Sequence, residues 1–173
     1  IHSGKTPRYL SSEQFTNDFI SAIRDKRTSE FRDYHRDVDI LLIDDIQFIS
    51  GKEQTQEGFF HTFNHLHNSN RQVVITCDRP PSEVPLLTER LRSRFEGGLV
   101  ADIQRPDVET RSAILARRCM ETGVQMQAPI IDHLALNSPN SIRQLLGNFT
   151  KVAAAADFLG KPITLDLAES FVP

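Results

Sequence analysis

The sequence lacks any apolar run near the roughly 20 residues that cross a bilayer, and its start does not read as a secretory signal. It has only two cysteines, Cys77 and Cys119, which are too far apart in sequence to form a metal-binding pair. We therefore expect reduced, structural thiols in a cytoplasmic protein. Internal repeats and low-complexity segments are also absent. Hydrophobic residues make up 39% and charged residues 25% of the chain, which is typical of a globular protein.

A strong excess of charge is missing too. The formal net charge is -3, so the composition does not by itself indicate a nucleic-acid-binding protein. Any contact with DNA would have to come from a local patch of side chains. The length of 173 residues is enough for one domain, or for a domain and a small subdomain.

The most informative stretch is Val38 to Phe48, in which four apolar residues, Ile40 to Ile43, run into Asp44 and Asp45. Such a short apolar run predicts a strand, Asp39 to Asp44, buried on both faces of a parallel sheet. Ligands of open α/β sheets bind beyond the carboxyl ends of the strands. A nucleotide-hydrolysing site needs one carboxylate to hold Mg²⁺ and a second to orient water. The alternative is a strand that simply ends in a turn, because aspartate is a common turn former.

A second buried strand is predicted from Gln72 to Cys77, and it too is followed by an aspartate, Asp78. Two parallel strands that end in aspartate favour a polar site along one edge of the sheet. Shorter apolar segments predict further strands at residues 8–10 and 99–103.

Helices are predicted between these strands. Ser11 or Ser12 caps the first helix, a second covers Ser29 to Tyr34, and a third runs from Glu53 to Ser69. The buried side of the third helix is marked by five residues at helical spacing, Phe59, Phe60, Phe63, Leu66 and His67.

The segment Thr88 to Phe95 predicts a helix on which Arg90 and Arg94 share one face. Arginine suits bidentate contact with phosphate, so this face is a candidate phosphate-binding surface. The alternative is a surface helix whose arginines pair with Glu89 and Glu96.

Two other patterns are interpreted as structural. The tripeptide Gly4-Lys5-Thr6 resembles the end of a phosphate-binding loop, but Pro7 and a predicted strand leave no room for the helix that such a loop requires. His61 and His65 lie four residues apart and could share a metal. No third ligand is evident, so we interpret them as surface or packing residues.

The segment Gln104 to Asp107 is the predicted boundary between residues 1–105, an α/β layer, and residues 106–173, an all-helical unit. In the helical unit Asp107 caps a helix that runs to about Thr122. Three more helices are predicted at about residues 130–137, 141–158 and 165–171, the last one capped by Thr164.

Taken together, several stretches resemble the AAA+ ATPase module of the bacterial replication initiators, the DnaA family. The order and spacing of the stretches along one chain make the resemblance specific, and it covers nearly the whole sequence. The stretches are SSEQFTNDF at 11–19, VDILLIDDIQF at 38–48, FFHTFN at 59–64, DRPP at 78–81, RLRSRF at 90–95 and IRQLLG at 142–147. The resemblance implies an α/β fold, an AAA+ P-loop NTPase parallel sheet with helices followed by a small all-helical lid.

The resemblance also implies ATP and Mg²⁺ as cofactors and gives roles to single residues. Asp44 resembles the residue that holds Mg²⁺, and Asp45 the one that orients the attacking water. Asp78 resembles the sensor 1 residue. Arg94 resembles the arginine finger that reaches the γ-phosphate of a neighbouring subunit in a head-to-tail oligomer, with Arg90 supporting that interface.

Further roles follow in the same way. Arg143 resembles the sensor 2 arginine, which contacts phosphate bound to its own chain. The helical pair between Ser12 and Tyr34 resembles the steric wedge that turns a ring into an open helix on single-stranded origin DNA. Lys52, Thr16 and Gln54 match the positions of the pore-facing DNA site, although some relatives carry an apolar residue in place of Thr16 and an arginine in place of Gln54.

The sequence departs from the family pattern in two ways. The phosphate-binding loop is not present, and Ile1-His2 resembles the end of the helix that follows it, so we interpret the chain as a fragment that lacks a middle strand of the sheet. The helix-turn-helix that reads duplex origin DNA is also absent. We expect a weak ATPase in the intact protein and an inactive fragment.

The same residues leave other functions open. A DnaA-related regulatory adaptor and an AAA+ helicase loader share this module, and a replicative helicase or regulatory proteins are possible partners. The joint presence of Asp44, Asp45, Asp78, Arg94 and Arg143 favours an initiator that binds ATP, assembles on origin DNA, opens the duplex and hydrolyses ATP slowly.

Overall fold

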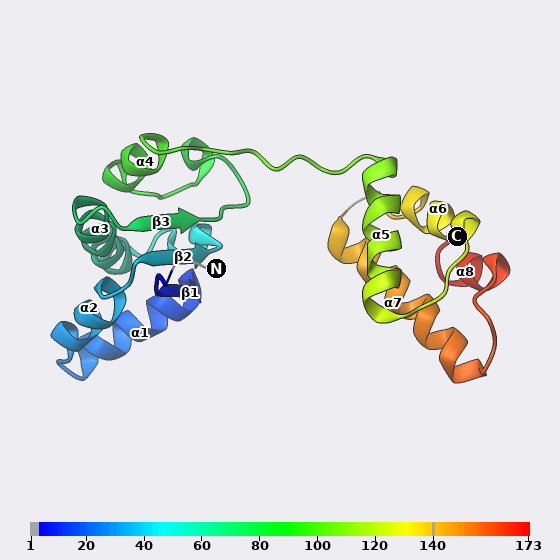
Figure 1. Cartoon of the computed structure of the whole chain (residues 1–173). Helices are drawn as coiled ribbons and strands as arrows, with labels where there is room; N and C mark the ends of the chain where they lie inside the picture. The colour runs from blue at the N-terminus through cyan, green and yellow to red at the C-terminus, as the bar shows by residue number, and fades with distance from the viewer. Residues whose placement is uncertain (1–3, 140) are drawn as a thin grey trace. The chain divides into compact units, whose positions relative to one another are not determined.

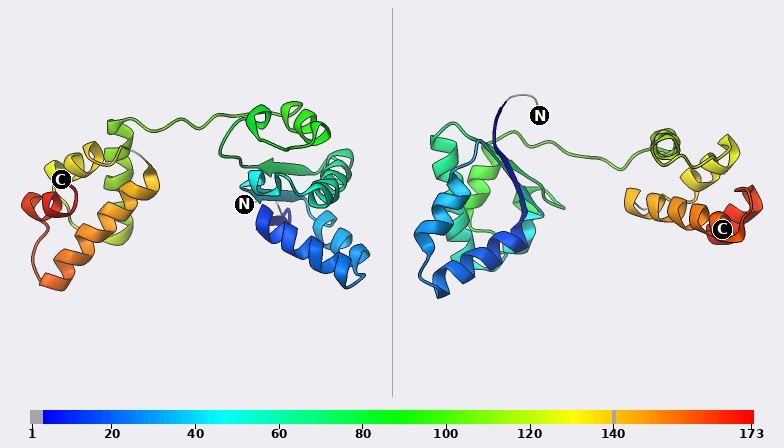
Figure 2. Two further views of the ribbon diagram at one scale, coloured as in Figure 1. Left: turned by 180° about the vertical axis from the view of Figure 1, so that it is seen from behind. Right: turned by 60° about the horizontal axis from the view of Figure 1, so that its bottom comes forward.

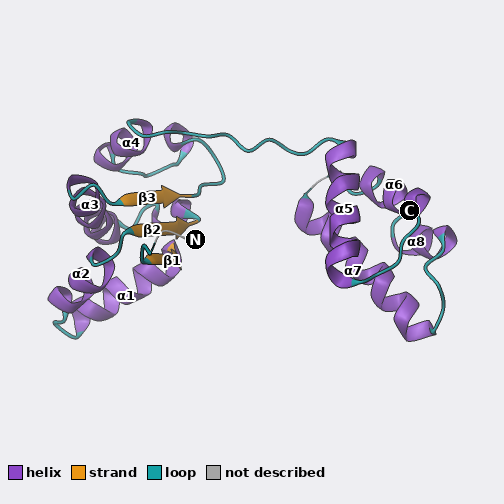
Figure 3. Ribbon diagram, in the orientation of Figure 1, coloured by secondary structure: helices purple, strands orange, loops and turns teal. Residues whose placement is uncertain are grey.

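The computed structural model describes residues 4–139 and 141–173, so the Ile1-His2 helix end lies outside the described part (Figure 1). The chain divides into two compact units between Ala101 and Asp102. Among the described residues, strands occur only in the first unit, whereas the second is helical (Figure 3). None of the helices in these residues is long and apolar enough to span a membrane.

A parallel three-stranded sheet forms the centre of the first unit. Its strands are β1 (Pro7–Ser11), β2 (Ile40–Asp44) and β3 (Gln72–Ile75), in the order β1-β2-β3. The register pairs Ser11 with Asp44 and Ile43 with Ile75, so all three strands end at one edge. The predicted strand at residues 8–10 is confirmed. No helix begins at Lys5-Thr6, as expected when β1 starts at Pro7.

The helices of the first unit lie where the sequence predicts them, with ends shifted by one or two residues. They are α1 (Ser12–Arg24), α2 (Thr28–Arg36), α3 (Glu53–Asn68) and α4 (Glu89–Glu96). Two short 3₁₀ turns, η1 (Ile46–Ile49) and η2 (Pro81–Glu83), follow β2 and β3. Ser11 caps α1, because its hydroxyl accepts the Gln14 N–H at 3.1 Å.

An aromatic cluster fills the space between these helices and the sheet. The ring of Phe15 lies 5.2 Å from that of Phe31 and 5.3 Å from that of Phe59, in edge-to-face geometry. Gly58 permits the close approach of α1 to α3, because a Cβ there would lie 2.6 Å from the Phe19 ring. The cluster therefore fixes α1 and α3 against the same core.

Burial of the central strand differs from the prediction. Leu41 and Ile43 are fully buried on the side of the aromatic core, but Leu42 is only half-buried. Tyr9 and Val74 flank Leu42 in the register and are 67% and 41% exposed. In the described residues the predicted burial therefore holds for one face of the strand, whereas the Leu42 face is only partly covered.

Two smaller predictions are wrong. His67 is exposed, whereas Thr62, which the prediction left out, is buried on α3. Residues 99–103 form no strand, and Leu99 and Ile103 are 98% and 94% exposed. Within the described residues β3 pairs only with β2, so this segment has no neighbouring strand to satisfy its N–H and C=O groups.

The second unit contains four helices that pack against one another (Figure 2). They are α5 (Val108–Thr122), α6 (Ala128–Leu136), α7 (Ile142–Leu159) and α8 (Leu165–Phe171). Asp107, Ser141 and Thr164 each accept a backbone N–H at the start of a helix. Leu115, Leu134 and Leu145 are fully buried between the helices.

Candidate functional site

The end of β2 brings Asp44 and Asp45 to the carboxyl edge of the sheet. Asp44 is the last residue of the strand and is half-buried. Asp45 turns the chain into η1 with a left-handed backbone, φ 56° and ψ 55°, which is unusual for a residue other than glycine. Because of this turn, the two adjacent carboxylates do not alternate along a regular strand.

Both oxygens of the Asp44 carboxylate accept hydrogen bonds from hydroxyl groups. The Tyr9 hydroxyl donates to Oδ2 at 2.9 Å, and the Thr76 hydroxyl donates to Oδ1. These bonds, with Thr76 first and Tyr9 second, lower the pKa of Asp44 below its ordinary value. The same contact with Asp44 raises the pKa of Tyr9. Asp44 is therefore held ionised and in one orientation.

Asp45 is held mainly through its backbone. Its N–H donates to the Thr76 hydroxyl oxygen at 2.9 Å, and its carbonyl accepts the Ser12 hydroxyl at 2.6 Å. The side-chain amide of Gln47 donates to Asp45 Oδ1 at 3.1 Å. The carboxylate itself is exposed at the edge of the sheet.

Asp78 follows β3 and is exposed. It makes a two-bond ion pair with the neighbouring Arg79, at 2.9 Å and 3.0 Å, which lowers the pKa of Asp78. In the part of the chain that the structure describes, no hydrogen bond joins Asp78 to Asp44. The connection between the two is Thr76, which binds Asp44 and lies two residues before Asp78.

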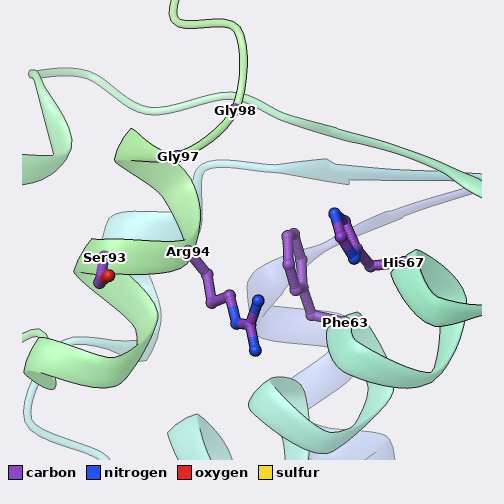
Figure 4. A pocket seen from close by; sticks show the side chains of 6 residues that line it. All are labelled: Phe63, His67, Ser93, Arg94, Gly97 and Gly98. Atoms are coloured by element: carbon purple, nitrogen blue, oxygen red, sulfur yellow. The ribbon is translucent and has the colours of Figure 1, made fainter.

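The two arginines predicted to share a face of α4 both lie along the side of α3. The Arg90 guanidinium stacks over the Phe60 ring, 4.1 Å from its centroid. Arg94 lines a cleft of about 180 Å³ with Phe63, His67 and Ser93, into which its side chain extends (Figure 4). Among the described residues neither arginine has an acidic partner within 4.0 Å, so the expected alternative of pairing with Glu89 and Glu96 does not hold for them.

The three candidate DNA-contacting positions differ in exposure. Lys52 and Gln54 are exposed where α3 begins. Thr16 is only 3% exposed, and its hydroxyl donates to the Ser12 carbonyl at 2.8 Å. In the second unit, Arg143 is exposed on the first turn of α7.

The acidic edge suits Mg²⁺ in its donor chemistry. Mg²⁺ prefers oxygen ligands, keeps several waters and takes one or two carboxylates together with substrate phosphates. The described residues contain no group of three or more His, Cys, Asp or Glu side chains that could enclose a metal. Asp44 and Asp45 fit this donor chemistry, in which waters and phosphate oxygens supply the remaining ligands.

Sequence reasoning missed Tyr9, Ser12 and Thr76. All three carry a hydroxyl. Ser12 and Thr76 come directly after β1 and β3 at the carboxyl edge, whereas Tyr9 lies in the middle of β1 and reaches this edge with its hydroxyl. That position was the available signal, because side chains at this edge face the acidic pair when the strands are parallel.

Comparison with known proteins identifies relatives of this arrangement. The family described as "Bacterial DnaA ATPAse domain" matches residues 2–102. The chromosomal replication initiator protein DnaA of Thermomicrobium roseum is 56% identical over 160 residues, which are 92% of this chain and 34% of that protein. The chain spans about a third of the length of the curated relatives it matches.

Two solved structures extend the comparison. Domain III of the Thermotoga maritima replication initiation protein DnaA superposes with a TM-score of 0.93 at 36% identity, covering 98% of this chain and 72% of that one. A replication initiator DnaA bound to AMPPCP and single-stranded DNA superposes with a TM-score of 0.80 at 32% identity, covering 91% of this chain and 50% of that one. The fold is thus the AAA+ α/β fold of these proteins, and the chain belongs to the bacterial DnaA ATPase domain family.

Proposed function

We propose that this chain is the larger part of the nucleotide-responsive module of a replication initiator. The module binds ATP with Mg²⁺, assembles head to tail into a helical oligomer on origin DNA, promotes opening of the duplex, and is switched off by slow hydrolysis. The observation that carries the proposal is the acidic pair, Asp44 and Asp45, held by hydroxyl groups at the carboxyl edge of a parallel sheet.

In this proposal the two aspartates act differently. Asp44 is oriented by Tyr9 and Thr76 and holds the metal. The metal, when bound, neutralises charge on the β- and γ-phosphates. Asp45 has an exposed carboxylate, which orients the attacking water. Aspartate reaches less far than the glutamate that many AAA+ proteins carry there, which supports slow hydrolysis. Asp78 senses the γ-phosphate after leaving its pair with Arg79.

The arginines contact phosphate groups of two nucleotides, one bound to a neighbouring subunit and one bound to the same chain. Arg94 contacts the γ-phosphate bound to a neighbouring subunit, and Arg90 supports the same interface. Their lack of an acidic partner within the described residues supports a role toward another chain. Arg143 of the helical unit, which serves as the lid, contacts phosphate bound to its own chain.

Single-stranded DNA binds at the start of α3 in this proposal. Lys52 supplies a phosphate contact and Gln54 a hydrogen bond, since both are exposed. Buried Thr16 supports α1 in its present position, and it could reach DNA only after a shift of that helix. The DnaA structure with AMPPCP and single-stranded DNA supports binding of both ligands by this family.

Nucleotide binding by the chain extended N-terminally through a phosphate-binding loop tests the proposal. We expect the extended chain to bind ATP in a Mg²⁺-dependent way, and the present chain to bind it far more weakly, because loop amides and a lysine supply most phosphate contacts. Equal binding by the two chains would contradict the proposed site. An extended chain that binds ATP but neither hydrolyses it nor assembles would instead be a regulatory adaptor.

A further inference from the structure

Three hydroxyl groups from separate segments converge on the acidic pair. Tyr9 belongs to β1, Ser12 begins α1, and Thr76 follows β3. Each of their bonds joins residues 31 to 35 positions apart in the sequence. The pair is therefore fixed by tertiary contacts and not by the local turn alone.

Thr76 serves both aspartates with a single hydroxyl. It donates its proton to Asp44 Oδ1 and accepts the N–H of Asp45 at 2.9 Å. A hydroxyl has one proton and two lone pairs, so it can make both bonds at once. As a result, the direction of the Asp44 carboxylate is set relative to the backbone of Asp45. Valine has the shape of threonine but can make neither bond, whereas serine can make both.

The backbone of Asp45 is tied on both sides. Its left-handed conformation is disfavoured for a residue with a Cβ, so surrounding contacts must hold it. Thr76 takes the N–H and Ser12 takes the carbonyl, at 2.9 Å and 2.6 Å. With both groups bound, the Cα–Cβ bond of Asp45 keeps a constant direction, and the Gln47 amide donates to its carboxylate at 3.1 Å.

Thr76 also links the acidic pair to the segment that carries Asp78. Its N–H donates to the Ile43 carbonyl at 2.9 Å, and its carbonyl accepts the Ile46 N–H at 3.0 Å. The backbone pairing of β2 and β3 thus continues through Thr76 beyond the end of β3. A displacement at Asp78 would move the hydroxyl that orients Asp44.

We propose that Tyr9 and Thr76 are positioning residues for the Mg²⁺-nucleotide site, acting through Asp44, and that Ser12 and Thr76 position Asp45. Each oxygen of Asp44 accepts one hydrogen bond from a hydroxyl group and keeps a further lone pair. That lone pair can accept a hydrogen bond from a water molecule of a hydrated divalent cation. Partners that orient a metal-binding carboxylate contribute to metal affinity without touching the metal. This inference rests on the proposed function.

The test uses the chain extended through a phosphate-binding loop and measures the affinity of a fluorescent ATP analogue, first in a Mg²⁺ titration and then in EDTA. We expect Thr76→Val to weaken the apparent Mg²⁺ affinity about tenfold. Affinity in EDTA should stay at the wild-type value, and Thr76→Ser should restore the Mg²⁺ affinity. A variant with only a structural defect would lose affinity in both conditions.

Tyr9→Phe is a second variant, and we expect it to leave the fold intact. Tyr9 is 67% exposed, so Tyr9→Phe removes the bond to Asp44 without disturbing the core. We expect apparent Mg²⁺ affinity to fall about threefold or more, in line with the loss of one charge-assisted hydrogen bond. Tyr34→Phe is the matched control, because Tyr34 is the other tyrosine of the chain and its ring stacks on Arg8 away from the acidic pair. It should bind Mg²⁺ as the wild type does.

Asp44→Asn separates the failure of this inference from the failure of the proposed function. If Asp44→Asn leaves the Mg²⁺ dependence intact, the metal-holding role of Asp44 and with it the proposed function are wrong. If Asp44→Asn removes the Mg²⁺ dependence but Thr76→Val and Tyr9→Phe both retain it, the positioning roles are overturned. Should Thr76→Val fail to fold, Tyr9→Phe decides.

Discussion

The acidic edge of the sheet and the arginines of α4 are prepared for binding in different ways. Asp44 and Asp45 receive hydrogen bonds from Tyr9, Ser12 and Thr76, all of the same unit. Arg90 stacks over the Phe60 ring, Arg94 lines a cleft with Phe63, and neither has an acidic partner among the described residues. The carboxylates are thus positioned by their own chain, whereas the arginines are cations that remain available to another molecule.

This difference has an energetic reason. A carboxylate that must hold a hydrated metal gains from fixed orientation, because the cost of ordering it is met during folding and not during binding. An arginine that reaches across an interface needs its guanidinium free, since a strong internal ion pair would have to break first. The phenyl rings can hold such a cation without neutralising its charge.

The largest expected effect comes from removing Arg94. In the extended chain, Arg94→Ala should leave ATP affinity unchanged but abolish ATP-dependent assembly, because truncating a desolvated charge at an interface costs about 3 kcal/mol, or roughly a hundredfold in affinity. Sedimentation in the presence of ATP and of ADP measures this. Arg117→Ala is the control, since Arg117 is an exposed arginine in a surface pair with Glu121 and has no proposed role in assembly. Unchanged assembly would contradict the proposed role of Arg94.

A somewhat smaller effect is expected from low pH, which should destabilise the fold through the buried residue His35. His35 is 1% exposed among Phe15 and Phe31, and neither ring nitrogen has a hydrogen-bond partner. Burial, and secondarily the charge of Arg8, lowers the pKa of His35 to about 4. The Asp18 carboxylate lies 4.0 Å from Nε2, beyond hydrogen-bond distance.

The sign follows from proton linkage. Between about pH 6.5 and 4 the unfolded chain binds a proton at His35 and the folded chain does not, so stability is full above pH 6.5 and falls as the pH drops to 4. The loss from this residue should be about 2–3 kcal/mol. Denaturant unfolding at several pH values measures it. His35→Phe should reduce the pH dependence, whereas His61→Gln, at an exposed histidine, should not. A wild-type slope in His35→Phe would rule out His35 as the cause.

The exposed start of α3 should show a third, weaker effect. Lys52→Ala in the extended chain should weaken the binding free energy for single-stranded DNA by about 1 kcal/mol. The slope of log affinity against log salt concentration should become shallower by about 0.7, the value for one phosphate contact. Gln54→Arg should do the opposite, because it adds a cation beside Lys52. Fluorescence anisotropy at several salt concentrations measures both. Lys151→Ala on α7 is the control, and an equal loss there would show that the effect is not local.

The sequence was sufficient where the signal is local. The caps Asp107 and Thr164 and the helical spacing of the apolar residues predicted the helices of the second unit closely. Local signals failed for residues 99–103, since a strand also needs a partner. They failed again for Tyr9 and Thr76, whose bonds to Asp44 span 35 and 32 residues. The aspartates themselves stood out in sequence, but the residues that orient them are defined only by the register of the sheet.

The smallest effect is expected at Leu86, where a left-handed backbone belongs neither to the acidic edge nor to the arginines of α4. Leu86, like Asp45, has a positive φ, 53°, and it is 76% exposed. Its carbonyl accepts the Gln56 side-chain amide at 2.9 Å, a bond that glycine at this position would keep. Leu86→Gly should therefore stabilise the chain by about 0.5 kcal/mol, because relief of the left-handed strain exceeds the entropy cost of glycine. Leu86→Ala keeps the strain and should not stabilise. Equal stability of the two variants in urea would show that relief of the strain at Leu86 does not exceed the entropy cost of glycine, which would contradict the prediction.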